Sequence, residues 1–334
     1  MACRLALALL LFGLVLPLPA PADTLIVGNK EADSVGFIDL ARGEMVVTRP
    51  TGQGPHEVAV SPDGSRAAVV AYGRRQGGQS ISLFDIATAT PLRVIDISPH
   101  SRPHGIVWMP DGRHLLVTAE GSGHLLLVDS EQGRIDAAIA TEARGSHMVA
   151  LAPDARRAFI ANLGGDSVSV VDLEARKTIR VVPVGPQTEG IAITPDGREL
   201  WVSARGEDRL VVLDAHSLER LAEIATGRIP IRVTLSRDGR VAVTSNAGDD
   251  SLTVIDTATR KVVATVALDV PEGARGIPVT ALFAPNGRRL FVSLTNSGEI
   301  AVLDSRTWRQ IGRIQAGAGA DGLGYAPLAL AIAD

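Results

Sequence analysis

Short apolar segments separated by polar turns repeat along almost the whole chain. One unit contains the segments Arg232 to Ser236, Arg240 to Ser245, Ser251 to Asp256 and Val262 to Ala267. Short alternating or apolar runs bounded by Gly, Asn, Asp and Pro predict β-strands, and no segment keeps a helical period for long enough to form a helix. We therefore expect four strands in each unit.

Two anchors define the repeat. The first is an apolar run that ends in Asp, found at Asp39, Asp85, Asp129, Asp172, Asp214, Asp256 and Asp304, with neighbouring copies 42 to 48 residues apart. The second is a Pro-Asp-Gly turn or a close relative, which begins at Pro62, Pro110, Pro153, Pro195, Arg237 and Pro285. Four strands in each of seven such repeats predict an all-β, seven-bladed β-propeller with four antiparallel strands per blade.

The two ends of the repeat array predict how the ring closes. The first strand, Leu25 to Asn29, has no opening strand before it, and residues 326–332 resemble residues 54–60, which begin a unit. We expect a C-terminal strand, Leu328 to Ile332, to pair beside Leu25 to Asn29 and complete the first blade. Closure of this kind removes the exposed sheet edges of an open array.

The seven repeated Asp residues suggest a metal or acid–base role at first sight. They are distributed one per blade, however, and a functional site needs side chains that converge. A carboxylate at the end of a strand can accept backbone N–H groups of the following turn. We interpret these residues as turn caps.

The N-terminal segment has the composition of a secretory signal peptide. Arg4 is followed by an apolar run from Leu5 to Leu16 and a small-residue site, Ala20-Pro21-Ala22. Residues 1–22 are therefore expected to be a signal peptide and residues 23–334 a single exported propeller domain in the periplasm, with no membrane span. Because the one cysteine is Cys3, the exported chain would form no disulfide and no covalent c-type haem link.

Composition and motifs exclude several classes of function. The formal net charge is −4, without long basic runs, which argues against nucleic-acid binding. Aromatic residues make up 3% of the chain, which argues against stacking platforms for sugars or bases. The sequence also lacks a Gly-x-Ser-x-Gly elbow, a phosphate-binding glycine loop and a His-Glu-x-x-His motif.

The repeat resembles the YVTN-type propeller repeats of exported bacterial and archaeal proteins. The similarity is greatest at residues 166–172 and 250–266, and the name motif is approximated at Phe159-Ile160-Ala161-Asn162. The resemblance implies an exported propeller from a family that contains surface proteins, binding proteins and relatives of cofactor-bearing propellers. Similar repeats often accompany periplasmic redox systems, including those that use quinone cofactors.

Candidate site residues lie where the innermost strands open, because these strands line the central channel of a propeller. The expected register across the blades is His56, His104, His147, Glu189, Arg232, Thr280 and Leu328. Three consecutive blades would thus present imidazole groups, followed by a carboxylate and a guanidinium group. We predict that His56, His104, His147, Glu189 and Arg232 form a ligand-binding channel mouth.

The three histidines have two interpretations. Together they could hold a divalent metal, Zn²⁺ or Cu²⁺, with Glu189 as a fourth ligand or as a base. Alternatively, each imidazole bonds to a backbone carbonyl and solvates the channel. His100 lies in the loop before His104, whereas His114, His124 and His216 belong to outer strands or turns and are weaker candidates.

Three longer loops interrupt the even repeat, at residues 73–79, 98–103 and 270–278. Loops of this kind lie on the surface, where binding residues concentrate. Their arginines, Arg74, Arg75, Arg102 and Arg275, either form an anion-attracting rim or are solvated loop charges.

The leading functional interpretation is a non-enzymatic periplasmic binding or scaffold protein that presents its channel mouth to a small ligand or protein partner. The alternatives are a metal-dependent hydrolase of the lactonase-like propeller type and a cofactor-binding relative of the nitrite reductase haem domain. The latter resemblance normally implies eight blades, whereas seven are counted here. A surface-adhesion role would predict further repeats or an anchor.

Overall fold

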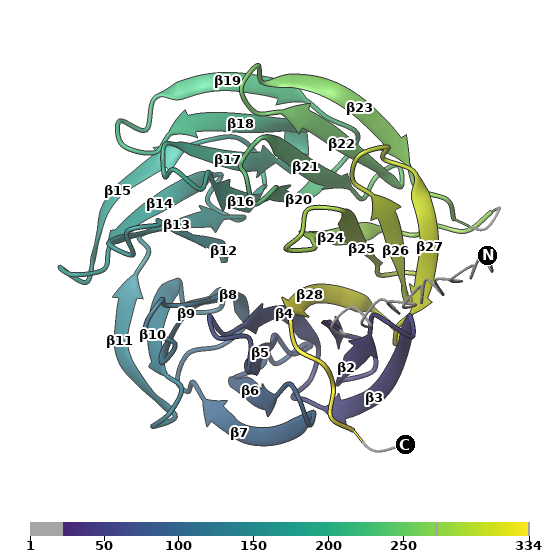
Figure 1. Cartoon of the computed structure of the whole chain (residues 1–334). Helices are drawn as coiled ribbons and strands as arrows, with labels where there is room; N and C mark the ends of the chain where they lie inside the picture. Colours follow the sequence, from purple (N-terminus) through teal and green to yellow (C-terminus); the bar gives the residue numbers. More distant parts are fainter. Residues whose placement is uncertain (1–22, 271–272, 333–334) are drawn as a thin grey trace, which may run out of the picture.

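The computed structural model describes residues 23–270 and 273–332, which form seven four-stranded antiparallel sheets around a central channel (Figure 1). The predicted seven-bladed propeller is confirmed. The one helical element in this part of the chain is a 3-10 turn, η1 (Arg205–Glu207). No helix within these residues is long and apolar enough to cross a bilayer. The predicted signal peptide lies outside the described residues.

Each blade is a sheet whose first strand lies beside the channel and whose fourth strand lies at the rim (Figure 1). From channel to rim, blade 1 consists of β28 (Ala320–Ala326), β1 (Thr24–Asn29), β2 (Ser34–Asp39) and β3 (Glu44–Pro50), and blade 2 consists of β4 (Pro55–Val60), β5 (Arg66–Ala71), β6 (Ser80–Asp85) and β7 (Thr90–Asp96). Blade 3 consists of β8 (Pro103–Trp108), β9 (His114–Ala119), β10 (His124–Asp129) and β11 (Arg134–Ala140). Blade 4 consists of β12 (Ser146–Leu151), β13 (Arg157–Asn162), β14 (Ser167–Asp172) and β15 (Lys177–Pro183). Blade 5 consists of β16 (Thr188–Ile193), β17 (Glu199–Ala204), β18 (Arg209–Asp214) and β19 (Arg220–Ala225). Blade 6 consists of β20 (Pro230–Leu235), β21 (Val241–Asn246), β22 (Ser251–Asp256) and β23 (Lys261–Ala267). Blade 7 consists of β24 (Pro278–Phe283), β25 (Arg289–Leu294), β26 (Glu299–Asp304) and β27 (Gln310–Gln315).

A C-terminal strand closes blade 1, as predicted, but the strand is not the one expected. The strand β28, residues 320–326, pairs with β1, so that Ala326 lies opposite Thr24. The predicted strand Leu328 to Ile332 is therefore wrong, because these residues follow β28 and form no strand.

The error arose because prolines occupy two different positions in the repeat. Pro55 and Pro103 begin inner strands, whereas Pro62 and Pro110 begin the turn after the inner strand. Pro327 comes directly after β28 and therefore corresponds to Pro62 rather than to Pro55. In the sequence, a small residue followed by Pro occurs both where an inner strand begins and where its following turn begins.

The hydrophobic core lies between neighbouring blades. One cluster joins Val70 and Leu83 of blade 2 to Leu115 and Val117 of blade 3, and Trp201 of blade 5 packs in a similar cluster with residues of blade 6. The middle strands are buried on both faces, whereas rim strands such as β7 are mostly exposed. Burial on both faces explains the apolar runs of the second and third strands in the repeat.

The seven repeated Asp residues cap turns, as predicted. The carboxylate of each accepts a backbone N–H two or three residues later, as at Asp39, Asp85, Asp129, Asp172, Asp214, Asp256 and Asp304. No metal or acid–base role is needed to explain these residues.

A second set of Asp residues fixes where several inner strands begin. Asp33, Asp166, Asp208 and Asp250 accept N–H groups from Gly54, Gln187, Ile229 and Ile277, each of which directly precedes an inner strand. The non-glycine residues of these pairs adopt a positive φ, between 49° and 56°. The hydrogen bonds help to hold this disfavoured conformation and with it the first residues of the next inner strand.

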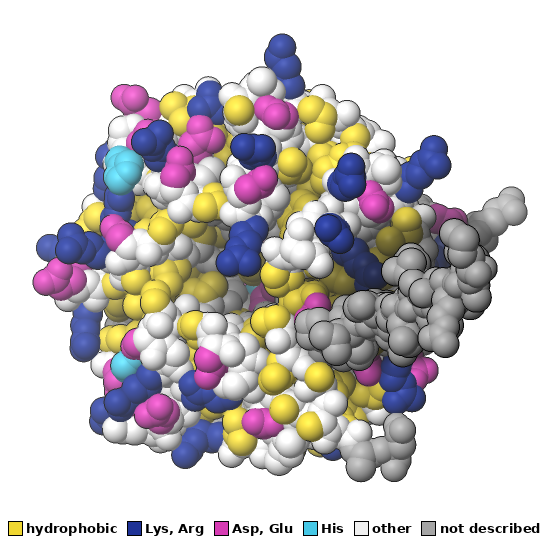
Figure 2. Space-filling view, viewed as in Figure 1, with side chains coloured by type: hydrophobic (Ala, Val, Ile, Leu, Met, Phe, Trp, Pro, Cys, Tyr) yellow, Lys and Arg dark blue, Asp and Glu magenta, His cyan; other side chains and the backbone are white. Residues whose placement is uncertain are grey.

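We call the side on which the inner strands begin the mouth face, and the side that carries the turns after the inner strands, such as residues 62–64, the turn face. The longer loops at residues 73–79, 98–103 and 270–278 precede or follow strand ends on the mouth face. Figure 2 shows the turn face, where hydrophobic side chains are visible between blades and charged side chains are scattered over the turns.

Candidate functional site

The second residue of each inner strand lies near the mouth face. The strand pairings place seven residues at this position, namely His56, His104, His147, Glu189, Ile231, Val279 and Asp321. Four of the predicted residues, His56, His104, His147 and Glu189, thus occupy the same position on four consecutive blades.

The predicted register is wrong in blades 6, 7 and 1. Arg232 and Thr280 are the third residues of their strands, and Leu328 lies outside the inner strand. Ile231 and Val279 are aliphatic, so blades 6 and 7 lack the polar residue by which this position is recognised in the sequence of the other blades. The proline that begins β4, β8, β20 and β24 was the better guide to this register.

Aromatic rings gather on one side of the channel. The imidazole centroids of His104 and His147 are 3.6 Å apart, with an angle of 33° between the planes, and those of His56 and His104 are 5.1 Å apart. The ring of Tyr72 lies 4.6 Å from His56 and 5.4 Å from His104. These four side chains form a continuous cluster, which we call the histidine cluster.

His56 has one nitrogen engaged and the other available. Its Nδ1 lies 2.9 Å from the carbonyl oxygen of Gly54. A carbonyl oxygen can only accept, so Nδ1 carries the proton and the lone pair is on Nε2. Burial lowers the pKa of His56, which keeps the imidazole neutral at pH 7. Metal-binding histidines are commonly oriented by a hydrogen bond of this kind from the other ring nitrogen.

His104 is the most deeply buried of the three histidines, with 2% of its surface exposed. Burial, together with the charges of His147 and His56, holds the pKa of His104 well below its ordinary value. Its Nδ1 is buried and has no hydrogen-bond partner among the described residues. A neutral imidazole with an unused polar atom is a second available contact for a ligand.

His147 has a different protonation state. Its Nδ1 lies 2.8 Å from Glu120 and its Nε2 lies 3.4 Å from Glu189. Burial opposes the charged form, but hydrogen bonds to these two carboxylates outweigh it and raise the pKa of His147. Both nitrogens of the resulting imidazolium face carboxylates, so neither offers a lone pair to a metal ion. The geometry thus gives no support to a metal site that uses all three histidines.

A buried ion-pair network bridges the channel next to the histidine cluster. The Arg232 guanidinium of blade 6 reaches Glu57 of blade 2 at 2.6 Å and Glu189 of blade 5 at 3.1 Å. Glu189 also pairs with Arg205 at 2.5 Å. All three of Arg232, Glu57 and Glu189 are less than 10% exposed. We call Arg232, Glu57, Glu189 and Arg205 the channel bridge.

The contacts within the channel bridge favour the charged forms of Glu189 and Arg232. Burial raises the pKa of Glu189, but His147, Arg232 and Arg205 more than compensate and lower it to about 2. Burial likewise opposes the charge of Arg232, whereas Glu57 and Glu189 raise its pKa. A buried charge is tolerated when it is paired and hydrogen-bonded in this way. The bridge therefore places fixed charges, rather than a titrating base, across the channel.

Several residues of the site were missed in the sequence. Glu57 and Asp321 belong to inner strands, and Asp321 pairs with Lys30 at 3.3 Å. Lys30, Tyr72, Glu120 and Arg205 each follow the last residue of a second strand. This position forms a second ring around the mouth, and the other blades carry Leu163, Ala247 and Thr295 there. Reading the repeat at this position would have revealed Tyr72 and Glu120.

The predicted rim arginines have individual partners. Arg74 pairs with Asp33 at 3.0 Å, and Arg275 pairs with Asp250 at 2.8 Å. The guanidinium of Arg102 lies 5.2 Å from the ring centroid of Tyr72, which joins the loop at residues 98–103 to the histidine cluster. These pairs are partly exposed, so the arginines remain available to an anionic ligand.

The other histidines lie apart from this site. His100 bonds to Ser122 and packs against His124, while His216 contacts Arg157. Among the described residues, one group of three has ligand atoms close enough for a metal ion, namely His114, Asp129 and Asp136. His114 faces Asp111 and Asp136 through its two nitrogens, and Arg113 pairs with Asp129. These contacts account for the group as an ion-pair cluster.

Comparison with known proteins identifies related propellers. Residues 111–248 match the family model of the cytochrome D1 heme domain. This match covers less than half of the chain, so it indicates similarity to that family. It includes His147, Glu189 and Arg232 but not His56 or His104. No curated protein matches the chain.

Solved structures show the same fold at low sequence identity. Dihydro-heme d1 dehydrogenase NirN in complex with DHE superimposes with a TM-score of 0.67 and 16% identity, covering 91% of this chain and 75% of that chain. A functionally unknown protein from Desulfotomaculum acetoxidans DSM 771 superimposes with a TM-score of 0.77 and 15% identity, covering 91% and 99%. The chain is thus a propeller similar to cytochrome d1 haem domains. The more specific YVTN-type resemblance stays a prediction.

Proposed function

We propose that this protein is an exported, periplasmic propeller that binds a haem d1-type tetrapyrrole at its channel mouth, with Nε2 of His56 as the iron ligand. The observation that carries the proposal is the hydrogen bond from His56 Nδ1 to Gly54, which orients a neutral imidazole and leaves Nε2 free. Similarity to the cytochrome D1 heme domain and to NirN supports a cofactor of this class.

The surrounding residues fit such a ligand. Tyr72 and His104 provide ring faces beside His56, and His104 Nδ1 lacks a partner within the described part of the chain. Arg74 and Arg102 lie on mouth-face loops, where they can pair with carboxylates of a tetrapyrrole. The channel bridge would limit how deeply a ligand enters. When bound, a haem iron supplies redox chemistry and an open coordination site.

The protein's own contribution is binding and orientation, in agreement with the leading interpretation of a non-enzymatic binding protein. His56 holds its proton on Nδ1, and Arg232 pairs with both Glu57 and Glu189. A partner from a periplasmic redox system would deliver or receive the ligand or its electrons.

A divalent metal is the competing occupant. His56 and His104 retain unengaged nitrogens and neighbour one another, so a Zn²⁺ or Cu²⁺ ion at the predicted three-histidine site would find only two imidazoles available. Two imidazoles leave positions open, as in hydrolytic metal sites. A lactonase-like activity would require this metal.

Titration with haem d1, and in parallel with iron protoporphyrin IX, tests the proposal by absorption spectroscopy. Wild-type protein should show a saturable Soret shift at a 1:1 ratio. His56→Ala should lose this shift or weaken binding by at least about tenfold, in line with the loss of a metal ligand or its support. His216→Ala, on the turn face, is the matched control. Identical spectra for wild type and His56→Ala would contradict the proposal. Zn²⁺ and Cu²⁺ titrations by calorimetry identify the competing occupant.

A further inference from the structure

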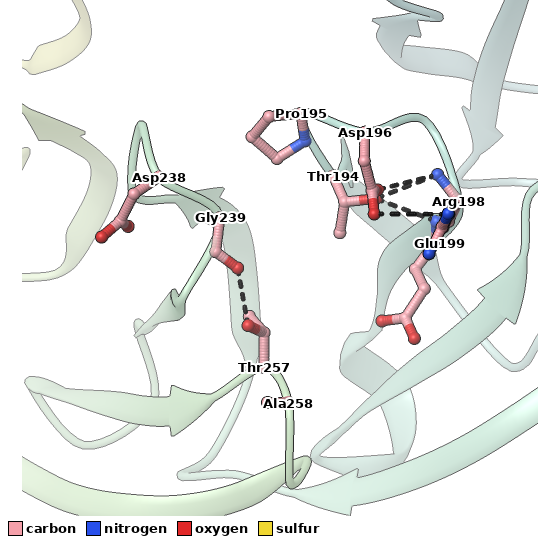
Figure 3. A pocket seen from close by; sticks show the side chains of 9 residues that line it. All are labelled: Thr194, Pro195, Asp196, Arg198, Glu199, Asp238, Gly239, Thr257 and Ala258. Atoms are coloured by element: carbon pink, nitrogen blue, oxygen red, sulfur yellow. Dashed lines mark hydrogen bonds and ion pairs between the residues drawn. The ribbon is translucent and has the colours of Figure 1, made fainter.

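Two neighbouring clefts between blades on the turn face are packed in the same way. In the cleft between blades 5 and 6, about 340 Å³ in volume, Pro195 of one turn lies over Gly239 of the next (Figure 3). A Cβ at Gly239 would lie 3.0 Å from Pro195, and one at Gly197 would lie 3.3 Å from Pro153. In these two clefts the proline of one turn covers the glycine of the following turn, whereas a Cβ at Gly112 would meet no atom within 4 Å although Pro62 stands in the preceding turn.

The cleft between blades 1 and 2 is filled by an extended segment of the chain itself. Pro327 lies over Gly64, at 3.4 Å from the position of a Cβ, and replaces the turn proline. Leu328, Leu330 and Ile332 then pack against the cluster that contains Phe37 and Phe84. Thr24 donates to the Leu328 carbonyl at 2.6 Å, and the Ala331 amide donates to Ala87 at 2.6 Å. In Figure 1 this segment crosses in front of blades 1 and 2.

The equivalent cleft between blades 6 and 7 has neither feature. The turn proline is replaced by Arg237, which is exposed, and a Cβ at Gly287 would meet no atom within 4 Å. The result is a cleft of about 430 Å³ whose apolar lining includes Val241, Phe283 and Trp308. Phe283 and Trp308 pack edge to face, with centroids 6.5 Å apart. The apolar surface here corresponds to the surface that the C-terminal segment covers in blades 1 and 2.

The two charged residues that line this cleft, Arg237 and Asp238, differ in their polar contacts. The Asp238 carboxylate accepts hydrogen bonds from the Ser236 hydroxyl and the Arg240 backbone amide. It also forms an ion pair with the Arg240 guanidinium at 3.9 Å. Arg237 has no ion pair or hydrogen bond within the part of the chain that the structure describes. An apolar cleft with an unpaired guanidinium at its edge complements an apolar segment that carries a carboxylate.

We propose that the cleft between blades 6 and 7 is a docking site for a partner protein segment that is extended, has aliphatic side chains at alternate positions and carries a carboxylate that pairs with Arg237. The chain's own residues 327–332 show how such a segment lies in a cleft of this shape. The site lies on the turn face, so it is independent of ligand binding at the mouth.

A peptide with the sequence Pro-Leu-Ala-Leu-Ala-Ile-Ala-Asp, that of residues 327–334, is the probe. Calorimetric titration into the intact protein should show saturable binding at 1:1. Emission of Trp308 should change on binding, because Trp108 and Trp201 are buried elsewhere. Val241→Arg, which obstructs the cleft, should weaken binding by at least about tenfold.

Arg237→Glu should weaken binding of this peptide and leave binding of an uncharged version, with amide in place of both carboxylates, unchanged. Arg198→Glu, at the turn of blade 5, is the matched control. Thermal unfolding of each variant confirms that the propeller is intact. Binding that is equal in wild type and Val241→Arg would place the peptide elsewhere, including the cleft of blades 1 and 2, and overturn the proposal, as would absence of binding.

Discussion

The channel of this propeller has two unlike halves. At one strand position, blades 1 to 5 carry Asp321, His56, His104, His147 and Glu189, whereas blades 6 and 7 carry Ile231 and Val279. The backbone pairing is the same in both halves, including the irregularity near the start of each inner strand. The repeat therefore accepts either kind of side chain, so the propeller fold by itself does not require ionisable residues at this position. Arg232, which stands one residue later, is the link between the halves.

The largest effect is expected when that link is removed. Arg232→Met would leave Glu57 and Glu189 buried without their cation, and we expect a loss of about 3–5 kcal/mol in the free energy of unfolding. Ile231→Ala, on the preceding residue, should cost only about 1 kcal/mol because Ile231 is partly exposed. Urea unfolding measures both. Similar losses in the two variants would contradict the distinction between halves.

A smaller effect should be seen in the protonation of His147. Glu120→Gln removes one carboxylate partner, so the pKa of His147 should fall. Because the pKa is raised in the folded protein, the stabilisation from His147 is complete below about pH 6.5 and is lost as the pH rises through the folded pKa. NMR titration of the imidazole nitrogens checks the shift. Glu142→Gln, on an exposed neighbouring position, should leave it unchanged.

The smallest effect concerns the edge of the ionisable half, where Asp321 and Lys30 act on His56 in opposite directions. Asp321 raises and Lys30 lowers the pKa of His56, within a net decrease that burial dominates. Asp321→Asn should therefore lower the pKa of His56 further, and Lys30→Gln should raise it. NMR titration of His56 in both variants tests this. If both variants shifted the pKa of His56 in the same direction, Asp321 and Lys30 would act on His56 through packing rather than through their charges.

The sequence predicted the fold well because its signals repeat. Seven Asp caps and six tight turns are local hydrogen-bonding chemistry, and each recurs at an interval that strand pairing requires. The closing strand was misplaced because Pro327 could be aligned with either of two prolines. A single proline did not distinguish the start of an inner strand from the turn that follows one.

The site was predicted in part for a related reason. His56, His104, His147 and Glu189 stand out because they are polar residues at the start of inner strands, where Ile231 and Val279 are aliphatic. Tyr72 and Glu120 belong to a different strand end and reach the same place only through the blade geometry. The state of His147 depends on carboxylates 27 and 42 residues away in sequence, as counted from Glu120 and Glu189. Contacts of this kind have no periodic signature.

The pairing of Ala326 with Thr24 also bears on circular permutation. Blade 1 is the one sheet whose first two strands are not joined by a turn, although the two residues lie opposite each other as in every other hairpin. A short Pro-Asp-Gly connection between them would convert this junction into a seventh copy of the same hairpin. The ring could then be cut at another turn, such as that at Arg237, with its sheets unchanged. Strand pairing within the sheets therefore fixes the order of the blades around the channel. The turn at which the chain begins and ends does not.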